Sequence, residues 1–374
     1  MKMRAAVLET VGATAPYALS KPLRVQEVEL DPPGPGELLV RIRAAGLCHS
    51  DLSVINGDRP RALPMVLGHE SAGEVVECAS DVRDLKPGDR VVLVFVPSCG
   101  HCVPCAEGRP ALCEPGAAAN GAGTLLSGER RLRLGGARLN HHTGVSCFAE
   151  YAVVSRRSCV KIKSDISHAK AALFGCAVLT GVGAVINTAR VQAGSTVAVL
   201  GLGGVGLNAL LAAVACGARE VVAIDLNDDK LSLARELGAT FTVNAASPNA
   251  AEAVRDLTRG GVDYAFEMAG AIRAMDLAWR ITRRGGSTVS AGLPNPEHRF
   301  SFSPVTLVAE ERTLRGSYIG SSVPMRDVPR YIDLYRRGKL PIDRLMGQQI
   351  ALDDINAGFD RLATGHSLRD VLVF

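Results

Sequence analysis

A glycine-rich turn, Gly201-Leu-Gly203-Gly-Val-Gly206, limits the folds open to this chain more than any other feature. The apolar segment Thr196–Gly201 before it is typical of a buried strand, and the apolar residues after it are typical of a helix. Glycines at this spacing let the backbone approach a pyrophosphate, which the N–H groups at a helix N-terminus stabilise. Asp225 ends the next predicted strand, nineteen residues after Gly206. A carboxylate there accepts hydrogen bonds from ribose hydroxyls and repels a 2′-phosphate, so the pattern predicts an NAD site rather than an NADP site.

The predicted cofactor-contacting residues are Gly201, Gly203, Gly204, Val205, Gly206 and Asp225. The alternative is a glycine-rich turn in a fold that binds no nucleotide, with Asp225 as an ordinary surface turn residue. Two interpretations of Lys230 stay open, a contact to the adenine ribose and an exposed helix lysine.

From about residue 170 onward, helical and strand patterns alternate. Helical periodicity covers His168–Thr188, and the later predicted helices are Asp228–Leu237, Asn249–Thr258 and Ile272–Thr282. The strands after Thr196–Gly201 are Val221–Asp225, Phe241–Val243, Val262–Glu267, Ser287–Gly292 and Thr313–Ile319. Six strands with intervening crossovers predict an α/β Rossmann fold with a doubly wound parallel sheet.

The first 170 residues instead show short strands separated by Gly and Pro, which is typical of a β-rich barrel or sandwich. These strands are Met3–Leu8, Leu38–Ala45, Glu70–Glu77, Arg90–Phe95 and Ala149–Val154, and the least regular stretch is Pro115–Gly144. The tail Val328–Phe374 is too short for its own core and ends in a predicted strand, Asp370–Phe374, so it should rejoin the first domain. We therefore expect a β-rich domain of residues 1–178 completed by 320–374, and a nucleotide-binding domain of residues 179–319.

Four cysteines, Cys99, Cys102, Cys105 and Cys113, have the spacing C-x2-C-x2-C-x7-C. Four thiolates close a tetrahedron around one zinc ion and leave no position for chemistry, so this site is predicted to be structural. A redox pair would not need the fourth cysteine. A zinc ribbon that binds nucleic acid would need basic and aromatic neighbours, and Arg109 is the only basic residue in the loop apart from His101, which we expect to face solvent.

Cys48, His69 and Cys176 are far apart in sequence and form a second candidate set. Two thiolates and one imidazole leave a fourth position open on zinc, as catalytic sites do. Each residue alone would be unconvincing, since a single cysteine or histidine is more often a core residue. The remaining cysteines, Cys78, Cys147, Cys159 and Cys216, are expected to be buried packing residues.

Composition sets the remaining limits. The 374 residues carry a net charge of +4, and 47% are hydrophobic and 21% charged. No long run of like charges points to nucleic acid or a membrane surface, and we see no secretory signal or spanning segment. We therefore expect a cytoplasmic protein with no nucleic-acid or membrane partner.

Taken together, these motifs resemble those of the zinc-dependent alcohol dehydrogenases of the medium-chain dehydrogenase/reductase family. The resemblance covers the chain essentially end to end, in five motifs besides the glycine turn: Gly46-Leu-Cys-His-Ser-Asp51, Gly68-His-Glu70, the four-cysteine loop, Gly175-Cys-Ala-Val-Leu-Thr-Gly-Val-Gly183 and Gly365-His-Ser-Leu-Arg369. The segment His141-His142-Thr-Gly-Val-Ser-Cys-Phe-Ala-Glu-Tyr151 resembles the longer-looped branch that includes the animal and glutathione-dependent enzymes. The resemblance implies a GroES-like fold for the β-rich domain.

The resemblance also implies roles for individual residues. Cys48, His69 and Cys176 would bind catalytic zinc, with Glu70 behind the metal as an alternative ligand or nearby carboxylate and Asp51 hydrogen-bonded to the His69 ring.

Ser50 would take the substrate proton, His49 and Arg369 would approach the cofactor pyrophosphate, and Thr180 the nicotinamide. Without the family match, Ser50 could be a turn hydroxyl and Arg369 a solvated tail charge. Many relatives have a proton-relaying histidine where this chain has Ser53, so the chain departs from the family's exit route for the proton at this position.

The function so implied is reversible NAD-dependent oxidation of a primary or secondary alcohol to an aldehyde or ketone. The alternative is a formaldehyde dehydrogenase that depends on a thiol such as glutathione or mycothiol. The expected pocket segments, Ser50–Asn56, Pro115–Asn140 and Leu293–Val308, do not decide between them, and Trp279 is expected on an outer helix. Relatives are dimers or tetramers, and Thr313–Ile319 resembles their pairing edge, so we expect a homodimer, with a homotetramer as the alternative.

Overall fold

Two units make up the part of the chain that the computed structural model describes, which is residues 1–163, 165–365 and 368–374. The first unit consists of Met1–Cys176, Val323–Ile332 and Asp343–Phe374, and the second consists of Ala177–Ser322 and Asp333–Ile342. Residues 333–342, which the sequence analysis assigned to the β-rich domain, go with the second unit here. His366 and Ser367 of the tail motif lie outside the described residues.

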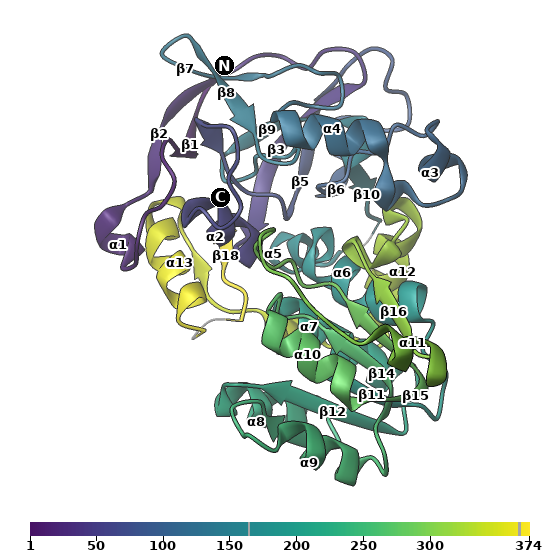
Figure 1. Ribbon diagram of the computed structural model, residues 1–374. Coiled ribbons are helices and arrows are strands. Elements are labelled where there is room, and N and C mark those ends of the chain that lie inside the picture. The colour runs from purple at the N-terminus through teal and green to yellow at the C-terminus, as the bar shows by residue number, and fades with distance from the viewer. Residues whose placement is uncertain (164, 366–367) are drawn as a thin grey trace. The chain divides into compact units, whose positions relative to one another are not determined.

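The second unit is built on a six-stranded parallel sheet with the order β13-β12-β11-β14-β15-β16 (Figure 1). Its strands are β11 (Thr196–Leu200), β12 (Glu220–Asp225), β13 (Phe241–Asn244), β14 (Val262–Glu267), β15 (Thr282–Ser290) and β16 (Thr313–Gly316). Its helices are α6 (Ala177–Gly183), α7 (Gly204–Ala215), α8 (Asp228–Glu236), α9 (Ala250–Leu257), α10 (Ile272–Ile281) and α11 (Pro304–Ala309). The order reverses beside β11, so the predicted doubly wound sheet is confirmed, and its crevice lies at the end of that strand.

Two strands of this sheet differ from the sequence prediction. β15 starts at Thr282, directly after α10, and the polar run from Arg283 to Gly286 forms an irregularity where its pairing with β14 shifts register. β16 ends at Gly316 instead of Ile319, because a 3-10 turn begins at Ile319 with a positive φ of 45°. The polar residues at the start of β15 concealed its full length in the sequence, and the turn after β16 makes that strand shorter than predicted.

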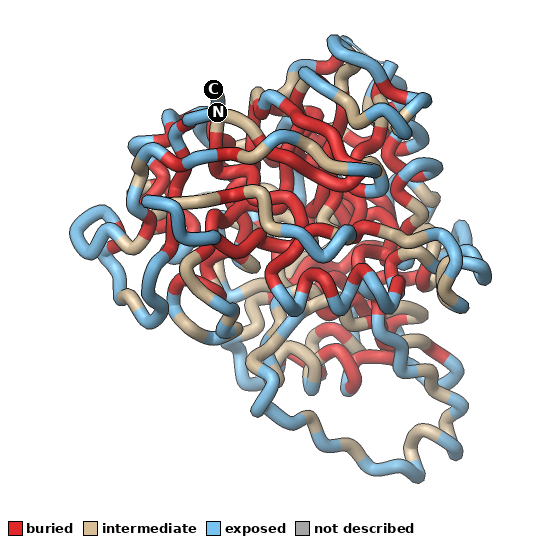
Figure 2. The backbone as a smooth tube through the Cα atoms, turned by 90° about the horizontal axis from the view of Figure 1, so that it is seen from above, coloured by how far each residue is buried: buried red, intermediate tan, exposed pale blue. Residues whose placement is uncertain are grey.

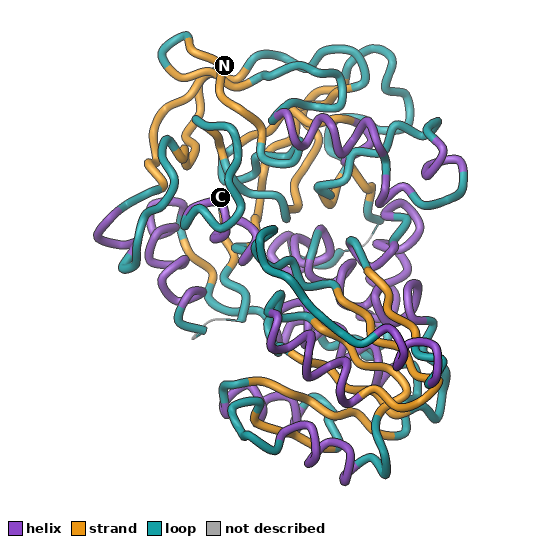
Figure 3. Tube along the Cα trace, viewed as in Figure 1, coloured by secondary structure: helices purple, strands orange, loops and turns teal. Residues whose placement is uncertain are grey.

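The first unit contains a closed barrel and a second sheet. The barrel has the order β1-β2-β7-β8-β4, and the second sheet has the order β10-β6-β5-β3-β18-β17, with β9 also paired to β3. Figure 3 colours the strands orange and the helices purple. The strands are β1 (Lys2–Leu8), β2 (Leu23–Leu30), β3 (Glu37–Gly46), β4 (Met65–Val66), β5 (Ser71–Cys78), β6 (Arg90–Leu93), β7 (Leu132–Leu134), β8 (Ala137–His141), β9 (Tyr151–Ser155), β10 (Cys159–Lys161), β17 (Gln349–Ile350) and β18 (Val371–Val373). The helices are α1 (Tyr17–Ser20), α2 (His49–Ile55), α3 (Val103–Ala106), α4 (Glu114–Ala122), α5 (His168–Ala172) and α13 (Ile355–Ala363), together with α12 (Pro324–Arg336), whose residues from 333 onward belong to the second unit.

The sequence prediction missed part of this barrel. β2 carries charged residues on its exposed face, and its pairing with β1 along seven residue pairs makes it a strand. The stretch predicted to be least regular contains α4 and the β7–β8 hairpin. As expected, the tail returns, and β18 pairs antiparallel with β3. Figure 2 shows the buried segments; the first unit's largest apolar cluster includes Ile42, Leu93 and Phe148.

The helical run predicted over His168–Thr188 is broken at Cys176. This residue has φ −142° and ψ −73°, outside the helical region, between a 3-10 turn (Leu173–Gly175) and α6, and a π-helix (Ala184–Ala189) follows α6. A Cβ on Gly175 would lie 2.4 Å from the Leu93 carbonyl oxygen, so this position packs tightly on β6. In the described residues no single helix is long and apolar enough to cross a membrane; only the bent pair His168–Gly175 and Ala177–Ala189 reaches that length and composition.

Candidate zinc and cofactor sites

Three separate segments of the first unit bring Cys48, His69 and Cys176 together. Cys48 precedes α2, His69 follows β4, and Cys176 follows the 3-10 turn after α5. Their ligand atoms all lie within 4.8 Å of one another, and all three side chains are buried. The structure therefore assembles the candidate set that the sequence could only propose.

The backbone around these residues is shaped by close contacts. Gly68 has a positive φ of 93°, and a Cβ there would lie 2.6 Å from the Phe148 nitrogen. Only glycine fits this turn, which places His69 next in the chain. At Cys48 the backbone is extended, and its N–H donates to Asp51 Oδ2 at 3.2 Å, as in a capping box for α2.

Asp51 also holds the ring of His69. Its Oδ1 lies 3.0 Å from His69 Nδ1, which is the hydrogen bond that the resemblance implied. Because Nδ1 then carries the proton, Nε2 is left as an acceptor. Nε2 is buried and has no hydrogen-bond partner among the described residues, which is costly for a polar atom. A metal ion bound by this nitrogen and the two sulfur atoms would satisfy it, so the residues fit zinc.

The thiols and the imidazole influence each other's protonation. A hydrogen bond from Cys176 lowers the pKa of Cys48 well below its ordinary value, with the charges of Arg369 and His69 adding to the effect. The same hydrogen bond raises the pKa of Cys176. Burial opposes a charge on His69, but the Asp51 carboxylate and Cys48 outweigh it and raise the pKa of the imidazole. The cluster thus already favours a thiolate at Cys48, the form that binds metal.

Glu70 and Arg369 lie next to this cluster. Glu70 is fully buried, and its Oε2 is 3.7 Å from Arg369 Nη1. Arg369 is 4% exposed and donates to the Leu47 carbonyl oxygen at 2.9 Å. Burial would lower the pKa of Arg369, but Glu70, Cys48 and Cys176 raise it. A solvated tail charge is therefore the wrong interpretation of Arg369.

Helix α2 carries the predicted proton-transfer and pyrophosphate residues. His49 is exposed and Ser50 is half-buried, both in its first turn. Ser53, one turn later, donates its hydroxyl to the His49 carbonyl oxygen at 2.9 Å. That hydroxyl proton is therefore committed to the helix backbone.

The four-cysteine loop forms a second cluster. The sulfur atoms of Cys99, Cys102, Cys105 and Cys113 lie within 4.8 Å of one another. Backbone N–H groups donate to the sulfur atoms, from Cys99 to Cys113 Sγ at 3.1 Å and from Cys102 to Cys99 Sγ at 3.3 Å. Backbone hydrogen bonds lower the pKa of Cys99 to about 6, and burial raises the pKa of Cys105 to about 12. His101 is exposed, as expected.

In the glycine turn of the second unit, Gly201 and Gly206 have no room for a side chain, whereas Gly203 faces open space. A Cβ on Gly206 would lie 1.8 Å from the Gly201 oxygen, and Gly201 itself has a positive φ of 87°. A Cβ on Gly203 would meet nothing within 4 Å. Helix α7 begins at Gly204 and Val205, so its unbonded N–H groups lie beside this open position. The arrangement fits a pyrophosphate group.

Asp225 lies at the end of β12, beside the glycine turn. Its Oδ2 accepts from the Leu202 N–H at 2.6 Å and its Oδ1 from the Asn227 N–H at 3.0 Å. The carboxylate is thus fixed against the turn, unlike that of an ordinary surface residue. Lys230 is half-buried on α8, and Thr180 is 9% exposed on α6.

The cysteines outside the two clusters follow the prediction only in part. Cys147 and Cys159 are buried, but Cys78 and Cys216 are half-buried. Trp279 is on α10 as expected, yet it is buried against Phe302, with the Arg312 guanidinium 5.2 Å from its ring centre.

The sequence analysis gave no role to His142, which the structure places beside His69. The two rings meet edge to face with centres 5.4 Å apart, and His142 Nδ1 is 3.2 Å from Asp51 Oδ1. Burial alone would raise the pKa of Asp51, but the imidazoles of His69 and His142 lower it, so the carboxylate stays ionised. The only available signal was the histidine pair in the motif of the longer-looped branch.

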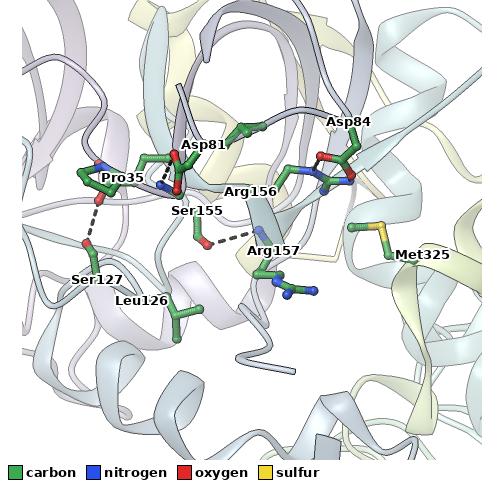
Figure 4. A pocket seen from close by; sticks show the side chains of 12 residues that line it. Pro35, Asp81, Asp84, Leu126, Ser127, Ser155, Arg156, Arg157 and Met325 are labelled. Atoms are coloured by element: carbon green, nitrogen blue, oxygen red, sulfur yellow. Dashed lines mark hydrogen bonds and ion pairs between the residues drawn. The ribbon is translucent and has the colours of Figure 1, made fainter. Parts of the chain in front are cut away.

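A separate hollow of about 630 Å³ lies on the first unit (Figure 4). Asp84 and Arg156 form an ion pair in its wall, and Arg157 and Met325 also line it. None of the predicted zinc or cofactor residues is among its described lining residues. The size of this hollow therefore does not identify it as the reaction site.

A parallel nucleotide fold combined with one closed and one open zinc cluster defines a zinc-dependent dehydrogenase. Two family profiles match the chain: an alcohol dehydrogenase GroES-like domain over residues 34–164 and a zinc-binding dehydrogenase domain over residues 204–337. The chain belongs to the zinc-dependent alcohol dehydrogenases of the medium-chain dehydrogenase/reductase family. It is therefore an oxidoreductase with zinc and NAD as cofactors.

Individual relatives match over nearly their whole length. S-(hydroxymethyl)glutathione dehydrogenase from Paracoccus denitrificans is 37% identical over 384 residues, covering 100% of both chains. Alcohol dehydrogenase class-3 from Drosophila melanogaster is 37% identical over 98% of both. The crystal structure of benzyl alcohol dehydrogenase from Acinetobacter calcoaceticus has a TM-score of 0.92 and 32% identity, covering 100% of this chain and 99% of that one.

Proposed function

We propose that the protein catalyses reversible NAD-dependent oxidation of a primary or secondary alcohol to an aldehyde or ketone. The observation that carries this proposal is the buried His69 Nε2, which has no hydrogen-bond partner among the described residues and lies with two cysteine sulfur atoms. Cys48, His69 and Cys176 hold the catalytic zinc, and Cys99, Cys102, Cys105 and Cys113 hold the structural zinc. When bound, zinc supplies a Lewis acid that stabilises negative charge on the substrate oxygen, and NAD accepts the hydride.

The residues of the chain perform the remaining tasks. Asp51 fixes His69 in the tautomer that presents Nε2. Ser50, in the first turn of α2, accepts the hydroxyl proton of the substrate. Glu70 and Arg369 form an ion pair next to the two thiols, which offsets part of the cost of burying either charge.

The second unit binds the cofactor in this proposal. Gly201, Gly203, Gly204, Val205 and Gly206 surround the pyrophosphate, with His49 and Arg369 as further contacts and Thr180 against the nicotinamide. Asp225 binds the adenosine ribose, and Lys230 is a candidate contact on the same side of the cofactor. The fixed orientation of the Asp225 carboxylate supports the choice of NAD over NADP.

A second candidate function is oxidation of a formaldehyde adduct of a thiol such as glutathione or mycothiol. The names of the two relatives at 37% identity favour it. Glutathione carries carboxylates, so its recognition needs available cations. The β7–β8 region has four arginines, and each already contacts a protein partner: Arg130 with Asn140, Arg131 with Glu37, Arg133 with Asp31 and Arg138 with Glu129. This supports the plain alcohol as the first candidate.

NADH formation across a panel of substrates tests both functions. The panel contains short aliphatic, long-chain, benzyl and terpenoid alcohols, and formaldehyde with and without glutathione or mycothiol. Turnover of plain alcohols that is abolished in Cys48→Ser supports the first function. Turnover restricted to formaldehyde with a thiol supports the second, and no turnover with any substrate contradicts both.

We also propose that the protein is cytoplasmic and acts as a homodimer, with a homotetramer as the alternative. β16 is the edge strand of the second unit's sheet, and edge strands pair readily with a second copy. Light scattering coupled to gel filtration distinguishes monomer, dimer and tetramer.

A further inference from the structure

One carboxylate oxygen faces two imidazoles in the first unit. Asp51 Oδ1 lies 3.0 Å from His69 Nδ1 and 3.2 Å from His142 Nδ1. His142 Nδ1 is buried and makes no hydrogen bond of acceptable geometry among the described residues, so a rotation of its ring is needed to complete one to Asp51. Of these three residues, the resemblance to the family gave a role only to His69 and Asp51.

The remaining contacts of Asp51 leave its carboxylate little freedom. Oδ1 also accepts from the Gly68 N–H at 3.2 Å, and Oδ2 accepts from the Cys48 N–H at 3.2 Å. Asp51 is fully buried, so its charge depends on these donors in place of water. Among the described contacts of Asp51, His142 Nδ1 is the only side-chain nitrogen besides His69 Nδ1 that lies within hydrogen-bond distance of its carboxylate.

The loop that carries His142 is held in a strained conformation. Thr143 and Ser146 have positive φ values of 50° and 51°, which non-glycine residues adopt at a cost. The Ser146 hydroxyl accepts from the His142 N–H and donates to the Val66 oxygen, both at 2.8 Å. This loop therefore fixes the His142 backbone against β4, the strand that leads to His69.

We infer that His142 is a positioning residue, which orients His69 toward zinc through the carboxylate that the two histidines share. His142 fixes one side of Asp51, so Oδ1 stays aligned with His69 Nδ1, and His69 Nε2 stays aimed between the two thiols. The inference rests on the proposed zinc site at Cys48, His69 and Cys176. It adds a residue that acts on the metal through another side chain and touches neither substrate nor cofactor.

The test compares His142→Phe, which keeps a ring but removes the donor, with His142→Asn, which keeps a donor near the Nδ1 position. Release of zinc from the purified protein is followed with a coloured chelator in the absence of substrate. We expect zinc to leave the open site roughly threefold to tenfold faster in His142→Phe, less than the 10–100-fold effect typical of a direct partner of a ligand. Asp51→Asn provides that direct-partner reference. Release from the four-cysteine loop is the internal control, since it should not change.

A spectroscopic measurement separates positioning from general loosening. With cobalt in place of zinc, the visible absorption bands report the ligand field, so they should shift in His142→Phe and remain unchanged in His142→Asn. Equal release rates in His142→Phe and the unaltered protein would overturn the inference, as would an Asn variant as fast as Phe. If the Phe variant does not fold, His142→Leu, which also lacks a donor, replaces it. Unchanged zinc content in Cys48→Ser would instead contradict the proposed zinc site itself.

Discussion

The carboxylate of Glu70 occupies the space that a side chain at Gly46 would need. A Cβ built on Gly46 lies 2.2 Å from Glu70 Oε1 and 2.9 Å from its Cδ. Gly46 is the last residue of β3, two residues before Cys48. The glycine at this position is therefore required by the charge packed behind the zinc cluster.

We expect Gly46→Ala to destabilise the protein by about 1–3 kcal/mol, because the buried carboxylate must move to accept the methyl group. If the Glu70 carboxylate moves, Arg369 loses its ion-pair partner next to the zinc ligands, so we expect the zinc content to fall as well. Denaturant unfolding and elemental analysis measure the two effects. Gly121→Ala is the matched control, since a Cβ there meets nothing within 4 Å and the position lies on α4. Equal stability of the two variants would contradict this reading of Gly46.

Asp225→Ser should change the choice of cofactor. Without the carboxylate, kcat/KM for NAD should fall roughly tenfold to a hundredfold, because hydrogen bonds to charged groups contribute about 1.5–3 kcal/mol. Loss of the negative charge also removes repulsion toward the 2′-phosphate, so the ratio of kcat/KM for NAD to that for NADP should decrease. Asp229→Asn removes a nearby charge in the first turn of α8 and serves as control. If the ratio of kcat/KM for NAD to that for NADP is unchanged in Asp225→Ser, the adenosine ribose does not contact Asp225.

Two serines on α2 should behave differently when each is replaced by alanine. Ser50→Ala should lower kcat at least roughly a hundredfold, the typical range for loss of a proton-transfer group. Ser53→Ala should leave kcat within about twofold of the original value, because the Ser53 hydroxyl already donates to the His49 carbonyl oxygen. Steady-state NADH formation measures both. A large loss in Ser53→Ala would show that this hydroxyl carries the proton after all.

Cys105→Ser should remove the structural zinc and leave the catalytic one. Three remaining thiolates cannot close the tetrahedron, so zinc content should fall from about two ions to about one per chain. The melting temperature should fall too, since the loop contributes few buried apolar side chains of its own; Val103 is 68% exposed and Leu112 is 40% exposed. Cys216→Ser, outside both clusters, should keep both ions. Retention of both ions in Cys105→Ser would contradict the four-thiolate site.

The sequence allowed strong predictions where the chemistry requires fixed residue types. The cysteine spacing and the glycine turn each have few alternatives, so the four-cysteine cluster and the parallel sheet were predictable in advance. The meeting of Cys48, His69 and Cys176 was predictable only through the family resemblance, because their contact depends on how distant segments fold.

Features set by tertiary contacts were not predictable in the same way. Cys176 interrupts a run whose periodicity reads as one helix, because Gly175 must pack on β6. The β7–β8 hairpin has charged residues on a short strand pair, and only its partners in the barrel make it regular. The role of His142 was not predictable either, because no local pattern shows that it shares the Asp51 carboxylate with His69, which lies 73 positions earlier in the chain.

β18 comes late in the sequence but pairs with β3 near its start, and this affects how the first unit folds during synthesis. Val371, Leu372 and Val373 pair with Gly46, Ala45 and Ala44, so the sheet beside Cys48 is completed by residues that a ribosome adds only after the whole second unit. The continuous segment Ala177–Ser322 can fold before β18 has been made, whereas the first unit must wait with an unpaired edge on β3 until Val371–Val373 have left the ribosome. A premature stop before Val371 would therefore damage the part of the protein that was made first, because β3 would lose its partner strand.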